Sequence, residues 1–227
     1  MDERFPYEFV TWSHKTPLGV KVSEVFGMDS KTGKVWLELA RQIFCEQGDQ
    51  TYRVIEHFEN GAPFIEGYPG RISITHTTHF FAVASLPKTP EVNLSEFNPR
   101  SALGIDAEPI DRQQVIKIRD RFLNDTEKDL INKEDIKSNI QAWTIKEAMY
   151  KCALTPGLDF RTNLIIKNIP PIDSNPENKN FNEFGEGKII FPESLNMPSQ
   201  KLLLYSYISY GCCISLALSP KSAKYGK

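Results

Sequence analysis

Two acidic residues, Asp106 and Glu108, lie two positions apart in the short apolar segment 103–108. In a β-strand, successive side chains point to opposite faces, so both carboxylates would lie on one face and Ile105 and Ala107 on the other. Two like charges at that separation repel each other, and a divalent cation is the simplest partner that makes the arrangement favourable. From these residues alone, a solvated strand face without a ligand is the competing interpretation.

A second set of polar side chains is predicted on one face of a helix over 138–153. Trp143, Glu147 and Lys151 are four residues apart, so the indole, the carboxylate and the ammonium would form one row. The opposite face carries an apolar stripe with helical spacing, formed by Ala142, Ile145, Met149 and Cys152. Taken alone, Glu147 and Lys151 also fit a surface ion pair, which contributes only a few tenths of a kcal/mol, and Trp143 fits a packing residue.

The two segments together are similar to a known pair of motifs. Residues 104–108 read GIDAE, and residues 143–151 read WTIKEAMYK. This order resembles the paired signature of the 4'-phosphopantetheinyl transferase superfamily, G-[IV]-D-x-E followed by [FW]-x-x-K-E-[AS]-x-x-K. RFLNDTE at 121–127 resembles the family's R-F-[FL]-[ST]-x-x-E. ISITHT at 72–77 is similar to its strand ending in S-H-[ST], and GAP at 61–63 stands where the family has G-K-P.

The resemblance implies transfer of the 4'-phosphopantetheine arm of coenzyme A to a serine of an acyl or peptidyl carrier protein, the reaction of a holo-carrier-protein synthase. It implies a magnesium ion held by Asp106, Glu108 and Glu147. Glu147 and Lys151 are the implied catalytic residues. Lys151 would offset charge on the phosphates together with the cation. From the chemistry of the reaction, we expect Glu147, directly or through a metal-bound water, to be the general base for the serine hydroxyl.

The resemblance also implies which residues contact coenzyme A. Lys151 and His76 would contact its phosphates, and Lys146 is a further candidate. Ala62 departs from the family pattern, because a lysine usually stands between the glycine and the proline and would contact a phosphate. The competing interpretation is therefore a catalytically impaired homologue that acts as a coenzyme A or carrier-protein binding module. Four other basic residues could replace the missing lysine: Lys15, Arg41, Arg53 and Arg71.

The length of 227 residues suits one large domain or two small ones. FFAVASLP at 80–87 and CISLALSP at 213–220 are similar, so each half ends on a similar strand. We expect an α+β fold with two similar lobes, each a helix packed on an antiparallel sheet, related by pseudo-twofold symmetry. The lobes would span 1–100 and 101–227, the second carrying the metal-binding carboxylates. The length resembles that of the Sfp type of the family, in which one chain holds two similar lobes, and this resemblance implies that a single chain forms the site. We therefore expect a monomer.

Strand and helix patterns divide between the halves. In the first half we expect strands near 7–12 and 19–25, a helix over 35–47, a strand over 53–58 followed by a hairpin turn at Asn60-Gly61, and further strand over 72–84. In the second half we expect a strand over 103–108, helices over 112–122, 125–131 and 138–153, and strands over 201–209 and 212–219. The segment 168–200 is rich in proline and glycine, so it is predicted to be a long surface excursion with a turn at 185–187.

Bulk composition excludes some classes of partner. Lys and Arg number 27 against 29 Asp and Glu, so no excess of positive charge favours nucleic acid or an anionic membrane. No apolar stretch approaches the roughly 20 residues of a membrane helix, and the N-terminus lacks the pattern of a signal peptide. The four cysteines have no CxxC spacing and are predicted to be small buried side chains. We therefore expect a cytoplasmic protein.

Overall fold

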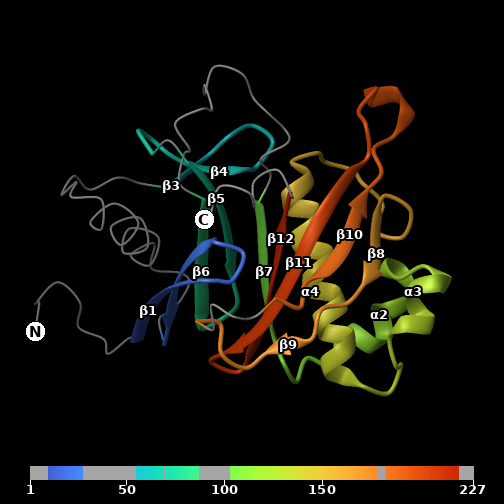
Figure 1. Cartoon of the computed structure of the whole chain (residues 1–227), viewed down its shortest axis with the longest axis horizontal. Helices are drawn as coiled ribbons and strands as arrows, with labels where there is room; N and C mark the ends of the chain where they lie inside the picture. The colour runs from blue at the N-terminus through green and yellow to red at the C-terminus, as the bar shows by residue number, and fades with distance from the viewer. Residues whose placement is uncertain (1–9, 28–54, 69, 87–102, 178–181, 220–227) are drawn as a thin grey trace, which may run out of the picture.

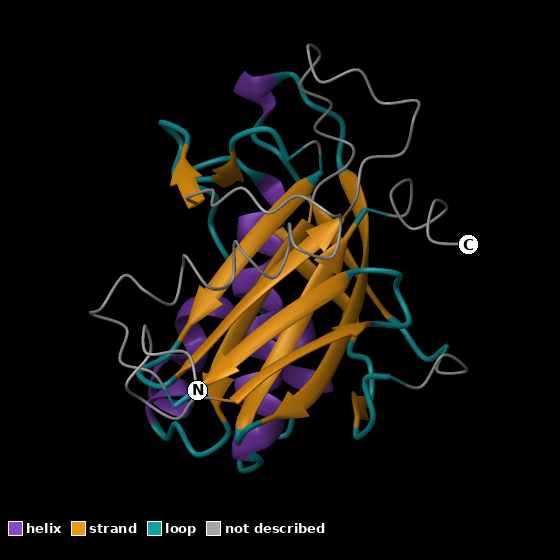
Figure 2. Ribbon diagram, turned by 90° about the vertical axis from the view of Figure 1, so that its left-hand side faces the viewer, coloured by secondary structure: helices purple, strands orange, loops and turns teal. Residues whose placement is uncertain are grey.

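The computed structural model describes residues 10–27, 55–68, 70–86, 103–177 and 182–219. These residues form an α+β fold in which most helices and strands occupy separate layers, as Figures 1 and 2 show. The described strands pair in antiparallel fashion, apart from one short parallel pair. The α+β class expected from the sequence is confirmed. The helix predicted over 35–47 lies outside the described residues.

The first sheet has four antiparallel strands in the order β1-β2-β6-β5. Their bounds are Val10–Lys15 for β1, Lys21–Phe26 for β2, Phe80–Leu86 for β6 and Arg71–His76 for β5. β6 is a continuous apolar run because both of its faces are covered. Phe80, Ala82 and Ala84 pack into a core shared with the second sheet. Phe81 and Val83 pack into a separate cluster on the other face.

A short hairpin packs beside β5 and consists of β3 (Ile55–His57) and β4 (Pro63–Ile65). The sequence predicts a turn at Asn60-Gly61, and the structure confirms it. Gly61 has φ of 80°, a left-handed conformation that glycine adopts without strain. The Asn60 side-chain oxygen accepts a hydrogen bond from the Ala62 N–H at 3.1 Å, which fixes the turn.

The second sheet has the strand order β7-β12-β11-β10-β8, and the short β9 pairs with β11 in parallel. The bounds are Leu103–Pro109 for β7, Cys212–Leu218 for β12, Gln200–Ser209 for β11, Gly185–Ile189 for β10, Leu164–Asn168 for β8 and Ile172–Asp173 for β9. The strands predicted over 103–108, 201–209 and 212–219 are confirmed within two residues at each end.

The prediction of a surface excursion over 168–200 is wrong for β10, and so is the turn at 185–187. β10 lies between β11 and β8, with both of its glycines buried. A Cβ on Gly187 would come within 3.0 Å of Met149 Cε, and a Cβ on Gly185 within 2.5 Å of Pro170 Cδ. The glycines that favour a turn in the sequence are therefore required here by close packing.

Three helices lie on one side of the second sheet (Figure 2): α2 (Gln114–Phe122), α3 (Asp125–Leu130) and α4 (Ile136–Ala153). α3 begins with a capping box, in which Asn124 and Glu127 each accept a hydrogen bond from the other's backbone N–H. α4 follows the N-cap residue Asp135 and ends at Leu154, which has φ of 52°. α4 packs along β7 and β12, and α2 packs on α4.

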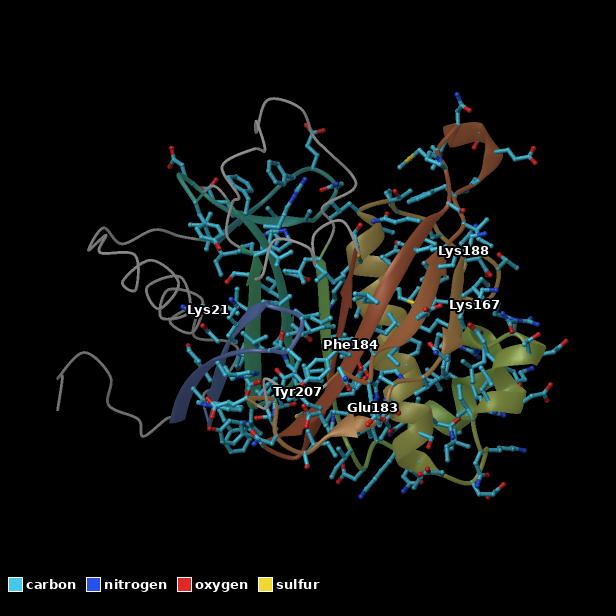
Figure 3. All side chains as sticks on the ribbon, viewed as in Figure 1. Lys21, Lys167, Glu183, Phe184, Lys188 and Tyr207 are labelled. Atoms are coloured by element: carbon cyan, nitrogen blue, oxygen red, sulfur yellow. The ribbon has the colours of Figure 1, made fainter. Side chains whose placement is uncertain are left out.

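The two sheets pack face to face through a shared apolar core that includes Ile105 and Ala107 of β7. Strand alternation then directs Asp106 and Glu108 toward α4, as the sequence predicts. In Figure 3 the labelled Phe184 and Tyr207 lie near the middle of the molecule, between Lys21 of the first sheet and Lys188 of the second. Tyr207 is a buried member of the shared core, and Phe184 packs against it.

Three of the four cysteines lie in the described stretches, and all three are buried and unpaired, as predicted: Cys152, Cys212 and Cys213. Burial raises the pKa of Cys212 to about 11 and that of Cys213 to about 12. These thiols stay protonated at neutral pH and pack as small apolar side chains. Cys45 lies outside the described residues. Across the described part of the chain, no helix combines the length and apolarity needed to span a bilayer.

Candidate active site

Helix α4 approaches strand β7 closely because Gly104 has no side chain. A Cβ at this position would come within 1.9 Å of the Ala148 carbonyl oxygen and 2.8 Å of the Cys152 amide nitrogen. The contact between the two backbones brings the polar row of α4 over the carboxylates of β7. Gly104 is therefore required by packing.

Asp106 is a buried carboxylate with one satisfied oxygen and one unsatisfied oxygen. It is 7% exposed, and its Oδ1 accepts hydrogen bonds from Lys151 Nζ at 2.7 Å and from Thr75 Oγ1 at 3.2 Å. Its Oδ2 is buried and has no hydrogen-bond partner. Burial raises the pKa of Asp106, and the charge and hydrogen bond of Lys151 act against that rise. An unsatisfied buried acceptor costs about 1–3 kcal/mol, so a cation at Oδ2 would be stabilising.

Glu108 is held by two donors from different elements. Its Oε1 accepts a hydrogen bond from Trp143 Nε1 at 3.1 Å and forms an ion pair with Arg112. Burial raises the pKa of Glu108, the charge of Arg112 lowers it, and the charge of Asp106 raises it. Trp143 thus orients a carboxylate in addition to packing. Arg112 was not singled out from the sequence, and its only signal there is a position four residues after Glu108.

Glu147 lies one helical turn before Lys151 on α4 and is partly buried. Burial is the main cause that raises its pKa to about 7, and the charges of Asp106 and Glu108 raise it further, while those of Lys151 and Arg112 lower it. Since both strand carboxylates act on Glu147, the three acidic groups share one electrostatic environment. Without a cation, Glu147 is about half protonated at neutral pH.

Lys151 connects the two sheets at the site. Its Nζ donates to the Ile74 carbonyl at 3.3 Å, to the Ile105 carbonyl at 3.0 Å and to Asp106 Oδ1 at 2.7 Å. An ammonium group has three N–H donors, so these contacts use all of them. A phosphate beside Lys151 would be attracted by its charge, but it could accept a hydrogen bond only by replacing one of these partners.

Strands β5 and β7 are joined by side-chain hydroxyls. Ser73 Oγ accepts a hydrogen bond from the Ile105 N–H at 3.1 Å, and Thr75 Oγ1 accepts one from the Ala107 N–H at 3.0 Å. Because Thr75 also donates to Asp106, it links the first sheet directly to the site. In the segment ISITHT, Thr75 stands where the family more often has serine, and no pattern in the sequence indicates this hydrogen bond.

His76 is the last residue of β5 and is exposed. Its ring stacks on Phe81, with 5.7 Å between the ring centroids. As the neighbour of Thr75 it points to the opposite face of β5. The ring is accessible to a ligand, and its role as a phosphate contact stays a prediction.

Lys146 is not accessible to a phosphate, which corrects its interpretation as a coenzyme A contact. It is 0% exposed and pairs with Glu127 Oε1 at 2.6 Å. Its Nζ also donates to the Phe160 carbonyl at 2.8 Å and to the Leu164 carbonyl. Burial lowers the pKa of Lys146 to about 8, against the opposing effect of Glu127. Lys146 therefore attaches α4 to α3 and to the start of β8.

Within the described residues, no group of three or more His, Cys, Asp or Glu side chains is arranged so that it could hold a metal ion. Two of the carboxylates already have cationic partners, because Lys151 contacts Asp106 and Arg112 contacts Glu108. The donor types nevertheless suit magnesium, which prefers hard carboxylate oxygens, and Asp106 Oδ2 has no other partner. The carboxylates fit a divalent cation if Glu108 releases its ion pair with Arg112 and binds the cation instead.

A pocket of about 230 Å³ opens beside Lys151, between the β3–β4 hairpin, β5 and the C-terminal end of α4. Its described walls are Asn60, Gly61, Ala62, Pro63, Ile72, Ser73, Ile74, Leu103, Tyr150, Lys151, Leu154, Thr155 and Pro156. Ala62 thus lies in the wall of a pocket that is also lined by Lys151, the partner of Asp106. Among the possible substitutes for a lysine there, Arg71 precedes the lining residue Ile72, Lys15 ends β1 at the far edge of the first sheet, and Arg41 and Arg53 lie outside the described residues.

Comparison with known proteins identifies the family of part of the chain. A search of curated proteins found none, whereas residues 102–194 match the family model described as the 4'-phosphopantetheinyl transferase superfamily. The matched stretch contains β7 and α4, and with them Asp106, Glu108, Glu147 and Lys151. The chain therefore carries a 4'-phosphopantetheinyl transferase superfamily domain at residues 102–194.

Proposed function

We propose that the chain transfers the 4'-phosphopantetheine arm of coenzyme A to a serine of an acyl or peptidyl carrier protein, in a magnesium-dependent reaction. One observation carries the proposal: in the transferase domain, the buried Asp106 pairs with Lys151 through one oxygen and leaves the other without a partner. Glu108 and Glu147 lie near enough for the charge of Asp106 to raise the pKa of each. A single divalent cation would offset the repulsion among the three carboxylates.

We assign this cation to Asp106, Glu108 and Glu147. Magnesium is usually shared between protein carboxylates and substrate phosphates. When bound, it would offset negative charge on the pyrophosphate of coenzyme A. Asp106 offers its unpartnered oxygen without any rearrangement, whereas Glu108 must first release Arg112.

The chain's own residues then have distinct roles. The serine oxygen forms a bond to the phosphorus that carries the pantetheine arm, and the bond from that phosphorus to the adenosine 3',5'-bisphosphate oxygen breaks. Glu147 accepts the serine proton as the general base, directly or through a metal-bound water. Lys151 holds Asp106 and places positive charge beside the phosphates. We also assign His76 to a phosphate contact from the first sheet, and because its ring stacks on Phe81, that phosphate would lie on the face of β5 opposite Thr75.

We further propose that residues 1–100 and 101–227 are two pseudo-symmetric lobes of the Sfp type. The four-stranded sheet lies entirely in the first range and the larger sheet entirely in the second. Thr75 and Lys151 link the two at the site. Since one chain supplies both sides of the site, we propose a monomer. The unpaired cysteines suit the reducing cytoplasm.

Intact-mass measurement of an apo carrier protein tests the transfer. With magnesium and coenzyme A, the chain should add one phosphopantetheine group to the carrier. Glu147→Gln should slow this addition about 100-fold or more, because the base is lost. Glu134→Gln, at an exposed position before α4, is the matched control and should not change the rate. Binding of coenzyme A or carrier by the unaltered chain without any mass gain would instead support the binding-module interpretation.

A further inference from the structure

Thr75 is a buried residue of β5 whose hydroxyl serves as both acceptor and donor. Its Oγ1 accepts a hydrogen bond from the Ala107 N–H at 3.0 Å and donates one to Asp106 Oδ1 at 3.2 Å. A hydroxyl has one hydrogen to donate, and an ionised carboxylate can only accept. The direction of both hydrogen bonds is therefore fixed, and the hydrogen of Thr75 goes to Asp106.

Two donors from different elements meet at one oxygen of Asp106. Lys151 of α4 donates to Oδ1 at 2.7 Å, and Thr75 of β5 donates to the same atom. The terminal torsion of an aspartate is broad and roughly twofold, so the backbone alone does not decide where each oxygen lies. Because Oδ1 is held from two elements, the carboxylate is oriented, and Oδ2 is left without a hydrogen-bond partner among the described residues.

The two donors would respond differently to a cation at Oδ2. The ammonium of Lys151 is positively charged, so it would be repelled by a cation on the other oxygen of the same carboxylate. A bound pyrophosphate would also attract it away from Asp106. The hydroxyl of Thr75 is neutral and buried, so neither charge displaces it. Thr75 is therefore the anchor of Asp106 that is compatible with a loaded site.

Ser73 shows which part of this arrangement is structural. Ser73 and Thr75 are each 3% exposed, and they lie on the same face of β5 because they are two residues apart. Ser73 Oγ accepts a hydrogen bond from the Ile105 N–H at 3.1 Å, just as Thr75 accepts one from the next such position of β7. The difference is the second hydrogen bond of Thr75, which reaches a carboxylate of the site.

We propose that Thr75 is a positioning residue for the metal site, because it holds Asp106 Oδ1 and thereby leaves Oδ2 facing the divalent cation. The inference rests on the proposed function, which assigns this cation to Asp106, Glu108 and Glu147. It adds that a residue of the first sheet, outside the matched stretch 102–194, sets the affinity of a site whose assigned ligands all lie within that stretch. Removing a partner that orients a metal ligand typically weakens metal binding by about 10–100-fold.

Manganese binding by the full chain at saturating coenzyme A, followed by electron paramagnetic resonance, tests the inference. Thr75→Val keeps the shape of the side chain and removes the hydroxyl, so the Kd for manganese should rise about tenfold or more. Thr75→Ser retains the hydroxyl and should stay within about twofold of the unaltered chain. Ser73→Ala removes the other hydroxyl that joins β5 to β7, and its Kd should also stay within about twofold.

Urea denaturation separates positioning from support of the fold. Thr75→Val and Ser73→Ala each remove the acceptor of a β7 N–H, so both should lower the unfolding midpoint. The inference is overturned if the two variants weaken manganese binding equally, or if Thr75→Val binds manganese as tightly as the unaltered chain.

Thr75→Cys keeps the test decisive if Thr75→Val does not fold. Its thiol is only a weak donor, so the Kd for manganese should lie between those of Thr75→Ser and Thr75→Val. A Kd equal to that of Thr75→Ser would count against the positioning role.

Carrier mass gain, measured in parallel, distinguishes this inference from the proposed function. Manganese binding that depends on Thr75, without any transfer to the carrier by the unaltered chain, would refute the proposed function and leave the inference standing. Transfer by the unaltered chain, with metal binding unchanged in Thr75→Val, would do the reverse. An unaltered chain that binds no manganese would refute the metal assignment and this inference together.

Discussion

Lys146 and Lys151 lie on the same helix, and each pairs with a carboxylate, yet the two pairs differ in completeness. Lys146 and Glu127 are 2.6 Å apart with side chains 0% and 1% exposed, whereas Lys151 and Asp106 are 2.7 Å apart with side chains 31% and 11% exposed. Both oxygens of Glu127 accept hydrogen bonds, from Lys146 and from backbone N–H groups. Asp106 leaves Oδ2 without a partner. The saturated pair stabilises the fold, and the unsaturated pair can take a ligand.

The largest effect on stability is expected when the saturated pair, Lys146 with Glu127, is broken. Lys146→Met leaves Glu127 charged and buried without its cation, which should lower the free energy of unfolding by about 3–5 kcal/mol. Urea denaturation measures the loss. Lys137→Met, at an exposed position of α4, is the control and should leave the unfolding midpoint unchanged. If both variants unfold at the same urea concentration, the scaffold role of Lys146 is wrong.

Breaking the unsaturated pair should affect activity more than stability. Lys151→Met removes the partner of Asp106 and the link to the Ile74 and Ile105 carbonyls. The free energy of unfolding should fall by about 1–3 kcal/mol, and phosphopantetheine transfer should slow about 100-fold or more. Urea denaturation and carrier mass gain report the two effects separately. If Lys151→Met loses as much stability as Lys146→Met and keeps its transfer activity, Lys151 supports the fold and not the reaction, contrary to the comparison.

Glu147 adds a pH dependence at the unsaturated pair. Its pKa is about 7 in the folded chain against an ordinary 4.5, so the unfolded chain loses this proton first as pH rises. The contribution of Glu147 to stability is therefore fully present below pH 4.5 and is lost as pH rises through 7. Glu147→Gln should be more stable than the unaltered, metal-free chain by about 1–3 kcal/mol at pH 8, with no difference near pH 4. A pH-independent difference in urea denaturation would contradict this assignment.

The smallest expected effect concerns Arg112, which competes with a cation for Glu108. Arg112→Gln should tighten magnesium binding about threefold to tenfold, because Glu108 no longer needs to exchange an ion pair. Isothermal titration with magnesium in the presence of coenzyme A measures the change. Weaker magnesium binding in this variant would mean that Arg112 supports the site instead of competing for it.

Strand alternation and helical spacing predicted the parts of the site that depend on local geometry. Both carboxylates of β7 point toward α4, and Lys151 contacts Asp106 while Trp143 contacts Glu108. These side chains meet because one strand and one helix present them at fixed intervals. The contact between the elements follows from Gly104, whose packing role can be read only from the structure.

The errors arose where long-range packing overrides the local pattern. Two closely spaced glycines, Gly185 and Gly187, are typical of a turn. In the structure they belong to strand β10, which packs so closely on Pro170 and Met149 that a Cβ would not fit. Lys146 lies beside Glu147 in the motif, but the helix directs it to Glu127. No spacing rule identifies a partner brought together by tertiary structure. The ion pair of Arg112 with Glu108 and the hydrogen bond of Thr75 to Asp106 were missed for the same reason.

The central claim is that Asp106, Glu108 and Glu147 bind one hard cation together. Manganese binding, followed by electron paramagnetic resonance in the presence of coenzyme A, tests it most directly because manganese shares the oxygen preference of magnesium. The unaltered chain and Glu134→Gln should each bind about one ion per chain, and Asp106→Asn should lose this binding while keeping its circular dichroism spectrum. Unchanged manganese binding in Asp106→Asn would contradict the account.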